Sequence, residues 1–538
     1  MNHTSPVVFS FAKDFGATFL TESFSYVTKE IKRADDITVS VQQDTSAFSD
    51  RVNAHECYRL QIDRVDEKLH IQITHAGRNG LLYALFAVCR MYRENRFPLG
   101  ATEDGPLFSV RGYIEGFYGR PWSHAARIKM LRYASSFGAS SHYYAPKDDP
   151  YHRKLWREKY PDEALVQIKE LADTARDYGM EFTYCIAPGL SICYASEEEF
   201  DKLKKKILQL YDIGIRSFGL LLDDIAPELY YEEDKQKYNS MVEAHIDLIN
   251  RTDAFLQTLV GCTLTVCPTE YWGKGDSEYL HALGNGIAEH IRIFFTGSDI
   301  CAKEIHTDEA RTFFEHTNRK PLYWDNYPVN DAEMFMEMHM GPLIGRDKNL
   351  WQYAQGEIFN CMEYAECTRI PLATALTYLW NPETYDPESA YMQAVQANIA
   401  PHEQHAFILF ADHLRTSCLK DENSHIMGQE LLRCMAAEQA GDREKAKEIF
   451  NAYLSQMQDA AKLLAQQTDG IYKELSAWTE KFLLCVDILA VCGDILFAGA
   501  DRKEELRKKM YDYNRNAVVL TAYCFREFAE IALGDFSY

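Results

Sequence analysis

The sequence of 538 residues lacks the features that identify several common protein classes. Its 14 cysteines include no CxxC pair and show no regular spacing, which argues against a disulfide framework or a zinc site. Its N-terminus has no basic segment followed by an apolar one, so it does not predict a signal peptide. The most apolar stretch, 482–498, contains Asp487 and Asp494 and is expected to be a buried helix. We therefore expect a cytoplasmic protein with free thiols, or a secreted one if a leader has been removed.

Positive charge is also scarce. The chain has 57 Lys and Arg residues against 80 Asp and Glu residues, so its formal net charge is -23. Because an acidic surface repels phosphate groups, we expect neither a nucleic-acid partner nor an anionic membrane surface. A neutral substrate, or one bound by short-range contacts, fits this charge better.

The length of the chain predicts more than one hydrophobic core, and the residue patterns divide it into three domains. Residues 1–105 mix strand and helix patterns and predict a small α/β domain, which ends in a segment rich in Gly and Pro at 97–106. Residues 387–538 are almost purely helical in pattern and predict a helical bundle. In the first domain we expect strands at 7–11, 37–41, 58–62 and 69–73 and a helix at 79–92. In the last domain we expect helices at 406–414, 446–464, 478–496 and 504–528.

Residues 106–386 alternate between short apolar runs and amphipathic helical segments. The eight runs that we expect to be strands lie at 110–114, 142–145, 181–186, 218–222, 263–266, 291–295, 322–324 and 357–359. Eight strands alternating with helices over this length are typical of a (β/α)8 TIM barrel. The alternative is an open doubly wound sheet, but no glycine-rich phosphate turn follows the first strand.

Polar side chains follow six of these expected strands. In a barrel, the C-terminal ends of the strands form one face, so these clusters would meet in a single pocket with aromatic walls. Such a pocket is typical of a sugar site, where rings stack on aromatic residues and hydroxyls pair with Asp and Asn. The clusters lie at 115–119, 147–149, 223–224, 267–272, 324–331 and 360.

Two adjacent carboxylates, Asp223 and Asp224, follow the apolar run 220–222. Burying such a pair is unfavourable, so we expect it to serve catalysis, metal binding or a helix cap. Neighbours on a strand point to opposite faces, so the strand must end here if both are to reach the pocket. The pair fits poorly to the usual spacing of two glycosidase carboxylates. It suits a reaction in which the substrate supplies the nucleophile, one Asp orients it, and the other donates the proton.

Five segments, in order and correctly spaced, resemble glycoside hydrolase family 84, which contains the protein O-GlcNAcases and related bacterial β-N-acetylglucosaminidases, some of them labelled hyaluronidases. They are RGYIEGFYG at 111–119, YAPKDDPYH at 144–152, LDDI at 222–225, CPTEY at 267–271 and WDN at 324–326. The resemblance covers about residues 30–370, and the flanking domains also look like the bacterial arrangement. One departure is Cys361, which stands where the family more often has Pro and bears on the leaving-group preference.

The resemblance implies retaining, exo-acting hydrolysis of terminal β-linked GlcNAc, with no metal and no organic cofactor. The 2-acetamido oxygen of the sugar would attack its own anomeric carbon and form an oxazoline. Asp223 would hold the acetamido N–H, and Asp224 would protonate the leaving oxygen and then deprotonate water. By motif position, the substrate would also be bound by Gly116, Lys147, Cys267, Tyr271, Trp324, Asn326, Asp331 and Asn360.

Two other functions stay open at this point. One is an endo-acting, hyaluronidase-type glycosidase, and the other is a non-catalytic glycan-binding protein on the same fold. The complete set of Asp223, Asp224, Lys147 and Asn326 favours catalysis, because a binding protein has no need of a proton donor. We expect a GlcNAc-bearing glycoprotein or glycan as the partner. The sequence leaves open whether the helical domain shapes the cleft or forms a homodimer.

Overall fold

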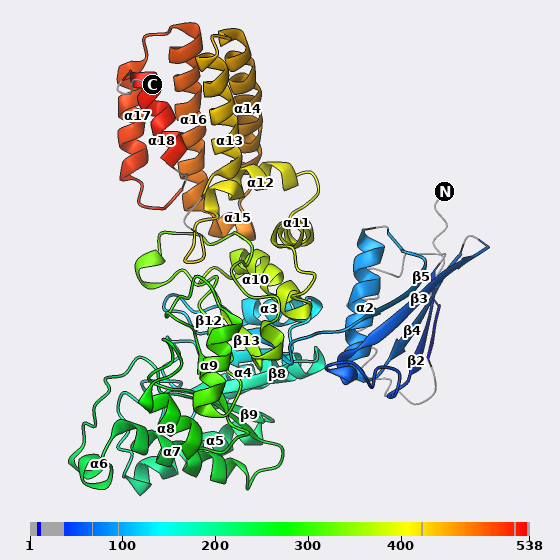
Figure 1. Ribbon diagram of the computed structural model, residues 1–538, viewed down its shortest axis with the longest axis vertical. Helices are drawn as coiled ribbons and strands as arrows, with labels where there is room; N and C mark the ends of the chain where they lie inside the picture. The colour runs from blue at the N-terminus through cyan, green and yellow to red at the C-terminus, as the bar shows by residue number, and fades with distance from the viewer. Residues whose placement is uncertain are drawn as a thin grey trace.

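The computed structural model describes residues 8–11, 37–66, 68–94, 96–420, 423–520 and 523–534 of the chain. Figure 1 shows a β-sheet with one helix beside a barrel, and a bundle of helices above the barrel. Each of these three regions has a hydrophobic core of its own. The predicted domain boundaries, after residues 105 and 386, stay a proposal that this arrangement supports.

Eight parallel strands of the described chain close into a barrel, in the order β10-β11-β12-β13-β6-β7-β8-β9. The ring closes because β10 pairs with β9 and β13 pairs with β6, which leaves no open edge. The predicted barrel is therefore confirmed, and the open sheet was wrong. The strands are β6 (Val110–Glu115), β7 (Ser141–Tyr144), β8 (Glu181–Ile186), β9 (Ser217–Leu221), β10 (Thr263–Cys267), β11 (Arg292–Phe295), β12 (Leu322–Asp325) and β13 (Gly356–Asn360).

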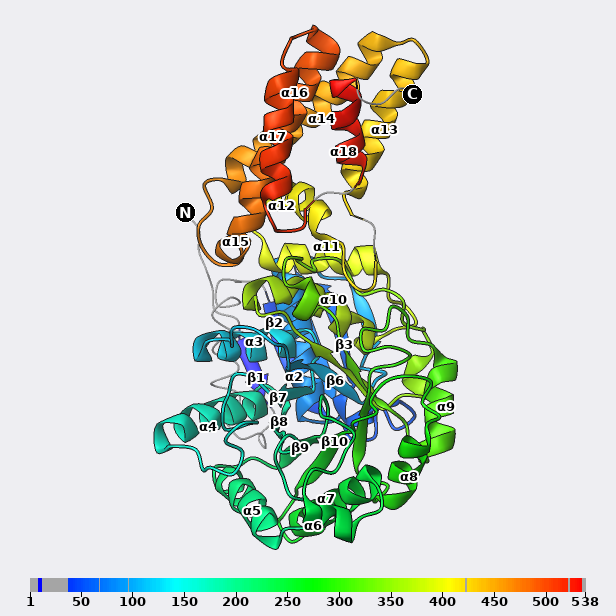
Figure 2. The ribbon, with the colours of Figure 1, turned by 90° about the vertical axis from the view of Figure 1, so that its left-hand side faces the viewer.

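Helices surround the barrel strands (Figure 2). Serine side chains cap two of them, since Ser123 accepts a hydrogen bond from the backbone N–H of Ala126, and Ser196 accepts one from that of Glu199. The helices of this region are α3 (His124–Ser136), α4 (Asp162–Asp177), α5 (Glu197–Asp212), α6 (Glu232–Lys237), α7 (Met241–Leu256), α8 (Glu278–Gly286), α9 (Thr307–Thr317) and α10 (Ala365–Trp380).

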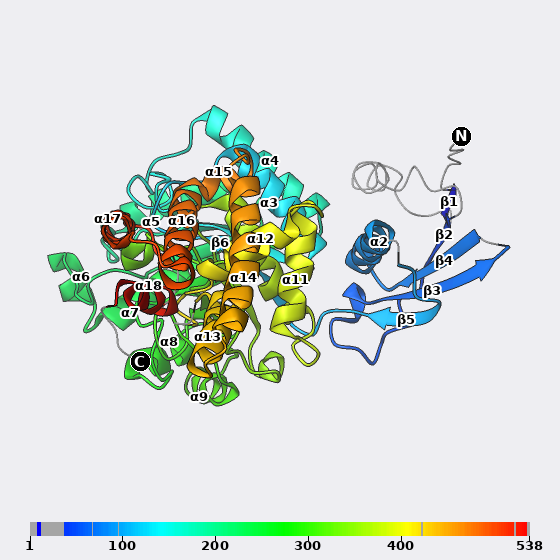
Figure 3. The same cartoon turned by 90° about the horizontal axis from the view of Figure 1, so that it is seen from above.

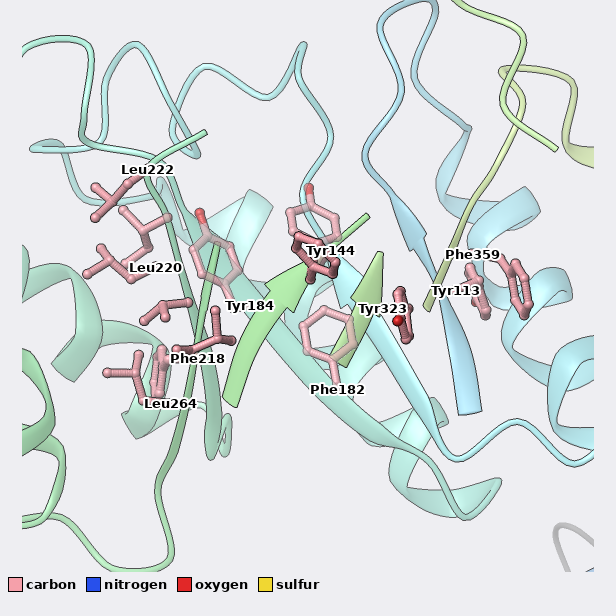
Figure 4. Close-up of a cluster of buried hydrophobic side chains, with 14 of the residues drawn as sticks. Tyr113, Tyr144, Phe182, Tyr184, Phe218, Leu220, Leu222, Leu264, Tyr323 and Phe359 are labelled. Carbon is pink, nitrogen blue, oxygen red and sulfur yellow. The ribbon is translucent and has the colours of Figure 1, made fainter. Parts of the chain in front are cut away.

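The barrel strands are apolar on both faces because they pack on both sides. Alternate residues belong to two separate clusters. One cluster lies between the strands and the helices, and Figure 4 shows its members Tyr184, Phe218 and Leu220. The other includes Cys185, Leu221 and other residues of opposite parity, and these fill the interior of the barrel. A residue's parity along its strand therefore decides whether it faces the interior or the helices.

The N-terminal sheet has the order β1-β2-β4-β3-β5, and α2 (Arg78–Arg93) packs against it (Figure 3). Strand β5 lies in the segment that the sequence predicts to be only a breaker-rich boundary. It pairs antiparallel with β3 and carries no buried residue, so backbone pairing stabilises it and no apolar pattern reveals it. The strands are β1 (Val8–Phe11), β2 (Ile37–Gln43), β3 (Tyr58–Val65), β4 (Lys68–His75) and β5 (Gly100–Asp104).

The C-terminal region is helical, as predicted, with one correction. The helix expected at 504–528 is two helices, α17 (Lys503–Arg515) and α18 (Tyr523–Leu533). Between them the ammonium group of the buried Lys481 donates to the carbonyls of Asn516 and Val518, at 2.9 and 2.7 Å, and stabilises a non-helical backbone there. The other helices are α11 (Pro387–Asn398), α12 (Gln404–Ala411), α13 (His425–Gln439), α14 (Arg443–Leu464), α15 (Ile471–Glu474) and α16 (Ser476–Ala498).

Helix α10 connects the barrel and the bundle. Its Leu372 and Leu376 belong to the barrel core, whereas its Cys367 and Ile370 belong to the core of the bundle.

The stretch 482–498 lies within α16, as expected for a buried helix, and no helix among the described residues is long and apolar enough to cross a membrane. Short 3-10 helices lie at Ala54–Glu56, Ala332–Met334, Leu350–Gln352 and Asp412–Leu414.

Candidate active site

All ten residues predicted for the site lie at or just beyond the C-terminal ends of barrel strands. Because parallel strands of a barrel end on one face, this placement brings them to the same rim. Gly116 follows β6, Lys147 follows β7, and the Asp pair follows β9. The remaining residues come from β10, β12 and β13 or the loops after them, and they are Cys267, Tyr271, Trp324, Asn326, Asp331 and Asn360.

The backbone at the Asp pair allows both side chains to reach the same site, although neighbouring residues on a strand point to opposite faces. Strand β9 ends at Leu221, which belongs to the interior cluster, so the parity of Asp223 is also that of the interior. Asp224 would then face the helices, but its φ of 52° lies in the left-handed region and turns the chain. The predicted end of the strand before the pair is confirmed. The side chain of Asp223 is 9% exposed and that of Asp224 is 36% exposed.

Lys147 joins the two carboxylates. Its Nζ lies 3.2 Å from Oδ2 of Asp223 and 3.8 Å from Oδ2 of Asp224. Burial disfavours the charged ammonium, but the two carboxylates and Tyr118 outweigh it and hold the pKa of Lys147 above its ordinary value. The lysine is therefore charged, and its charge lets two carboxylates lie side by side in a mostly buried site.

Two phenols hold the carboxylate of Asp224. Tyr271 donates its hydroxyl to Oδ1 at 3.0 Å, and Tyr118 donates its hydroxyl to Oδ2 at 2.8 Å. Burial raises the pKa of both phenols, and the charge of Asp224 raises it further, so both keep their protons and stay donors. Arg153 in turn donates to the Tyr118 hydroxyl at 2.9 Å. Asp224 is thus oriented by neutral groups while part of it faces solvent.

A second network lies on the side of β12 and β13. Asn326 Oδ1 accepts hydrogen bonds from the indole of Trp324 at 3.1 Å and from the amide of Asn360 at 2.9 Å. Asn360 Oδ1 accepts from the backbone N–H of Gly116 at 3.2 Å. A Cβ at Gly116 would lie 2.7 Å from the Trp324 ring, so only glycine fits there. This network fixes the edge of the indole at the floor of the site.

Comparison with known proteins decides the family. Residues 111–412, more than half of the chain, match the family model described as beta-N-acetylglucosaminidase. The chain belongs to this family. Its members are glycoside hydrolases, which confirms the resemblance seen in the sequence.

Individual relatives of this beta-N-acetylglucosaminidase family agree. Protein O-GlcNAcases of Rattus norvegicus and Mus musculus are 33% identical over 273 residues, which make up 50% of this chain but only 29% of theirs. An O-GlcNAc hydrolase mutant of Thermobaculum terrenum is 31% identical, with a TM-score of 0.75 over 79% of this chain and 95% of that one. The structure of CpGH84B is 25% identical, with a TM-score of 0.83 over 98% and 97% of the two chains.

Neither Tyr118 nor Arg153 is among the site residues that the sequence predicts. Both stand in or next to the motifs at 111–119 and 144–152, Tyr118 two residues after Gly116 and Arg153 directly after 144–152. Their position at strand ends was the available signal, and their direct contacts with Asp224 and with each other are visible only in the structure.

Two further predicted residues, Asp331 and Cys267, lie near the Asp pair. Asp331 accepts a hydrogen bond from the backbone N–H of Tyr118 at 2.7 Å, and burial raises its pKa. Cys267 is buried, and burial together with the charge of Asp223 raises the pKa of its thiol, which keeps it neutral. Cys267, Trp324 and Tyr271 belong to one apolar cluster, so they form a nonpolar wall beside the carboxylates.

The described residues contain no group of three or more His, Cys, Asp or Glu side chains arranged to hold a metal ion. Whether the site works without a metal or cofactor stays a prediction. The charge that a cation would supply beside the two carboxylates comes here from Lys147.

Proposed function

We propose that this chain is a retaining exo-β-N-acetylglucosaminidase of the O-GlcNAcase type, which hydrolyses terminal β-linked GlcNAc from a glycoprotein or glycan with help from the substrate's own acetamido group. The observation that carries the proposal is the adjacent pair Asp223 and Asp224, placed at the C-terminal rim of the barrel and bridged by Lys147. Membership of the beta-N-acetylglucosaminidase family supports the same reaction.

Asp223 supports the nucleophile. Its mostly buried carboxylate is paired with Lys147 at 3.2 Å and accepts the acetamido N–H. That hydrogen bond raises the electron density on the acetamido oxygen and aims it at the anomeric carbon, where it forms the oxazoline and releases the leaving group. Cys267, Trp324 and Tyr271 provide the apolar wall against which the acetamido methyl group packs.

Asp224 transfers the proton. It is the more exposed of the two carboxylates, and a leaving oxygen arrives from the solvent side. In the free protein both of its oxygens accept phenol hydrogen bonds, so a protonated Asp224 must turn one oxygen away from a phenol to present its proton. Tyr118 is the phenol that yields, because it is 47% exposed. The same carboxylate then takes a proton from the water that opens the oxazoline.

The hydroxyls of the sugar are bound by the residues around this pair. Lys147 and the backbone at Gly116 reach one edge of the ring, and Asp331 and Asn360 reach the outer edge. The hydrogen bonds from Tyr118 to Asp331 and from Gly116 to Asn360 join the loop after β6 to the loops after β12 and β13. These bridges support a pocket closed at one end and exo action rather than the open groove of an endo-acting enzyme.

The net charge of -23 further disfavours a polyanionic polymer such as hyaluronan as the substrate. The natural aglycone, a homodimer formed through the helical region, and a cytoplasmic location stay predictions.

The test is steady-state hydrolysis of an aryl β-GlcNAc in parallel with the matching aryl β-glucoside. We expect turnover of the acetamido sugar alone and inhibition by a thiazoline that mimics the oxazoline. Equal turnover of both sugars would contradict assistance by the substrate. Turnover of neither sugar by well-folded protein would favour the binding protein or a strictly endo-acting enzyme, which glycan binding and polymer cleavage would then separate.

A further inference from the structure

A turn from the helical region reaches the rim of the barrel. Residues 417–420 lie between the 3-10 helix Asp412–Leu414 and α13, and Ser417 and Lys420 exchange two backbone hydrogen bonds, at 3.0 and 3.2 Å. Leu419 in this turn is buried in the barrel core cluster. The turn is therefore held tightly against the barrel, and it carries Cys418 at a fixed position.

The thiol of Cys418 faces the thiol of Cys301, which lies in the loop after β11. The two side chains are hydrogen-bonded to each other, and both are free thiols in this structure. Both residues are only partly buried, so small molecules in solution can reach them. The two cysteines are 117 residues apart in the sequence, and no spacing pattern predicts that they meet.

The surroundings give the two thiols different reactivities. The hydrogen bond from Cys418 lowers the pKa of Cys301, although burial and the nearby carboxylates of Asp331, Asp325 and Asp299 oppose this. The pKa of Cys418 is raised by the same hydrogen bond and by burial. Cys301 is therefore the thiol that ionises first, and a thiolate is the form that attacks a disulfide.

We propose that Cys301 and Cys418 form a reversible disulfide that ties the helical region to the active-site rim. The oxidant is a low-molecular-weight disulfide, RSSR. The Cys301 thiolate attacks one sulfur of RSSR and releases RS⁻, which leaves a mixed disulfide. Cys418 then attacks the Cys301 sulfur and releases the second RS⁻. In sum, two protein thiols and RSSR become one protein disulfide and two RSH, so the two electrons lost by the protein reduce the reagent.

Asn326 contacts both segments that carry the two cysteines. The sulfur of Cys418 lies 3.5 Å from the backbone oxygen of Asn326, and the carbonyl of Ile300, next to Cys301, accepts from the Asn326 amide at 2.8 Å. Disulfide formation requires the sulfurs to approach to about 2.05 Å. This movement pulls together the turn and the loop that hold Asn326, whose Oδ1 in turn positions Trp324 and Asn360. Oxidation should therefore reduce catalysis, an effect that rests on the proposed function.

The disulfide itself is tested without any activity measurement. The folded full-length protein is incubated with oxidised glutathione, its remaining thiols are alkylated, and the digest is analysed by mass spectrometry. We expect a linked peptide that contains residues 301 and 418, lighter by two hydrogens than the two free peptides and absent after treatment with dithiothreitol. Alkylation of both cysteines, or glutathione on Cys301 with Cys418 still free, would overturn the proposal.

Two variants make the result specific. Cys301→Ser should abolish the link, whereas Cys262→Ser should leave it intact, because Cys262 is also partly buried but lies elsewhere on the barrel. In the wild-type protein and the Cys262→Ser control, oxidation should lower turnover of aryl β-GlcNAc about tenfold, and dithiothreitol should restore it, because small displacements of positioning groups have effects of this size or larger. Cys301→Ser should turn over substrate equally with and without the oxidant.

The two readouts separate the failures. An unchanged rate in fully linked protein would overturn the coupling to Asn326. Absence of turnover in both the reduced and the oxidised protein would count against the proposed function, while the linked peptide would still decide the disulfide.

Discussion

Two clusters on the same barrel combine two carboxylates with one cation, and they differ in almost every other respect. At the C-terminal rim of the barrel, Lys147 hydrogen-bonds Asp223 at 3.2 Å and forms a longer ion pair with Asp224 at 3.8 Å. On the outer side of β12 and β13, Arg346 donates two hydrogen bonds to Asp325, at 2.8 and 2.7 Å, and both side chains are almost fully buried. Glu357 completes this second cluster, and within the described chain neither of its carboxylate oxygens has a hydrogen-bond partner.

The difference shows what separates the proposed reactive cluster from a structural one. Arg346 is committed to Asp325 by a two-point contact, so Glu357 cannot share it, and burial raises the pKa of Glu357 well above its ordinary value. Lys147 makes single-point contacts, and phenols hold the second carboxylate while leaving it open to solvent. Strand parity assigns the two roles, since Trp324 belongs to the interior cluster and its neighbour Asp325 has the opposite parity.

The largest expected effect on activity concerns Asp223, in the cluster around Lys147. Asp223→Asn should lower kcat on every β-GlcNAc substrate by about a thousandfold, because the acetamido group loses a charged acceptor that acts in the transition state. Steady-state kinetics on activated and unactivated substrates would measure this. Asp325→Asn is not a matched control, because it breaks a buried ion pair, so Asp148→Asn in the neighbouring loop serves instead. A near-wild-type rate for Asp223→Asn would remove this residue from the mechanism.

The second prediction concerns the shared cation. Lys147→Met should lower kcat/KM by about a hundredfold, because the two carboxylates then repel each other and a contact to the sugar is lost. Steady-state kinetics on an aryl β-GlcNAc would measure this loss. A near-wild-type kcat/KM would show that Lys147 neither holds the two carboxylates together nor binds the sugar.

A smaller effect is expected for the phenol that yields. Tyr118→Phe should change kcat by about tenfold or less, because it removes one neutral hydrogen bond to Asp224 and leaves the one from Tyr271. Tyr271→Phe, measured in parallel, should cost more, since it removes the hydrogen bond that still orients Asp224 when Tyr118 moves away. If the two variants lost the same activity, the different roles given to the two phenols would be wrong.

Glu357→Met should have the smallest effect on catalysis, and it tests the structural cluster around Arg346. It should leave catalysis unchanged and raise the free energy of unfolding by about 1–3 kcal/mol at pH 8, because a buried carboxylate without partners is removed. The raised pKa means that the folded protein binds more protons than the unfolded one between the unfolded and folded pKa values, so wild-type stability falls as pH rises through that window. The gain should be smaller at pH 5.

Urea unfolding of wild type and Glu357→Met across this pH range measures the effect. Exposed Glu383 provides the control Glu383→Gln, which should follow the wild type at every pH. Stability of Glu357→Met that is lower than that of the wild type at pH 8 would mean that Glu357 is stabilised by partners in solution.

The sequence predicts most of this fold because the buried strands are apolar runs of residues. All eight barrel strands are such runs, and the polar residues of the site follow them at the ends where barrel sites form. The sequence does not predict strand β5, because backbone pairing alone stabilises it. It does not predict the break between α17 and α18 either, because this break depends on Lys481, a residue on another helix.

Within the site, motif positions predicted the residues near Asp223 and Asp224 but not the contacts among them. Tertiary packing between segments distant in the sequence produces these contacts. Examples are the left-handed backbone of Asp224, the hydrogen bond from Tyr118 to Asp224, and the hydrogen bond between Cys301 and Cys418. No local pattern records such contacts.

The most direct test of the account compares Asp224→Asn with the wild type on two aryl β-GlcNAc substrates, one with an activated phenolate leaving group and one with a poor leaving group. A proton donor matters only when the leaving oxygen needs the proton, and general acids contribute about 10²–10⁴-fold. We predict a loss of this size in kcat/KM on the poor leaving group and a much smaller loss on the activated one. Equal losses on both substrates would contradict the division of roles between the two adjacent carboxylates.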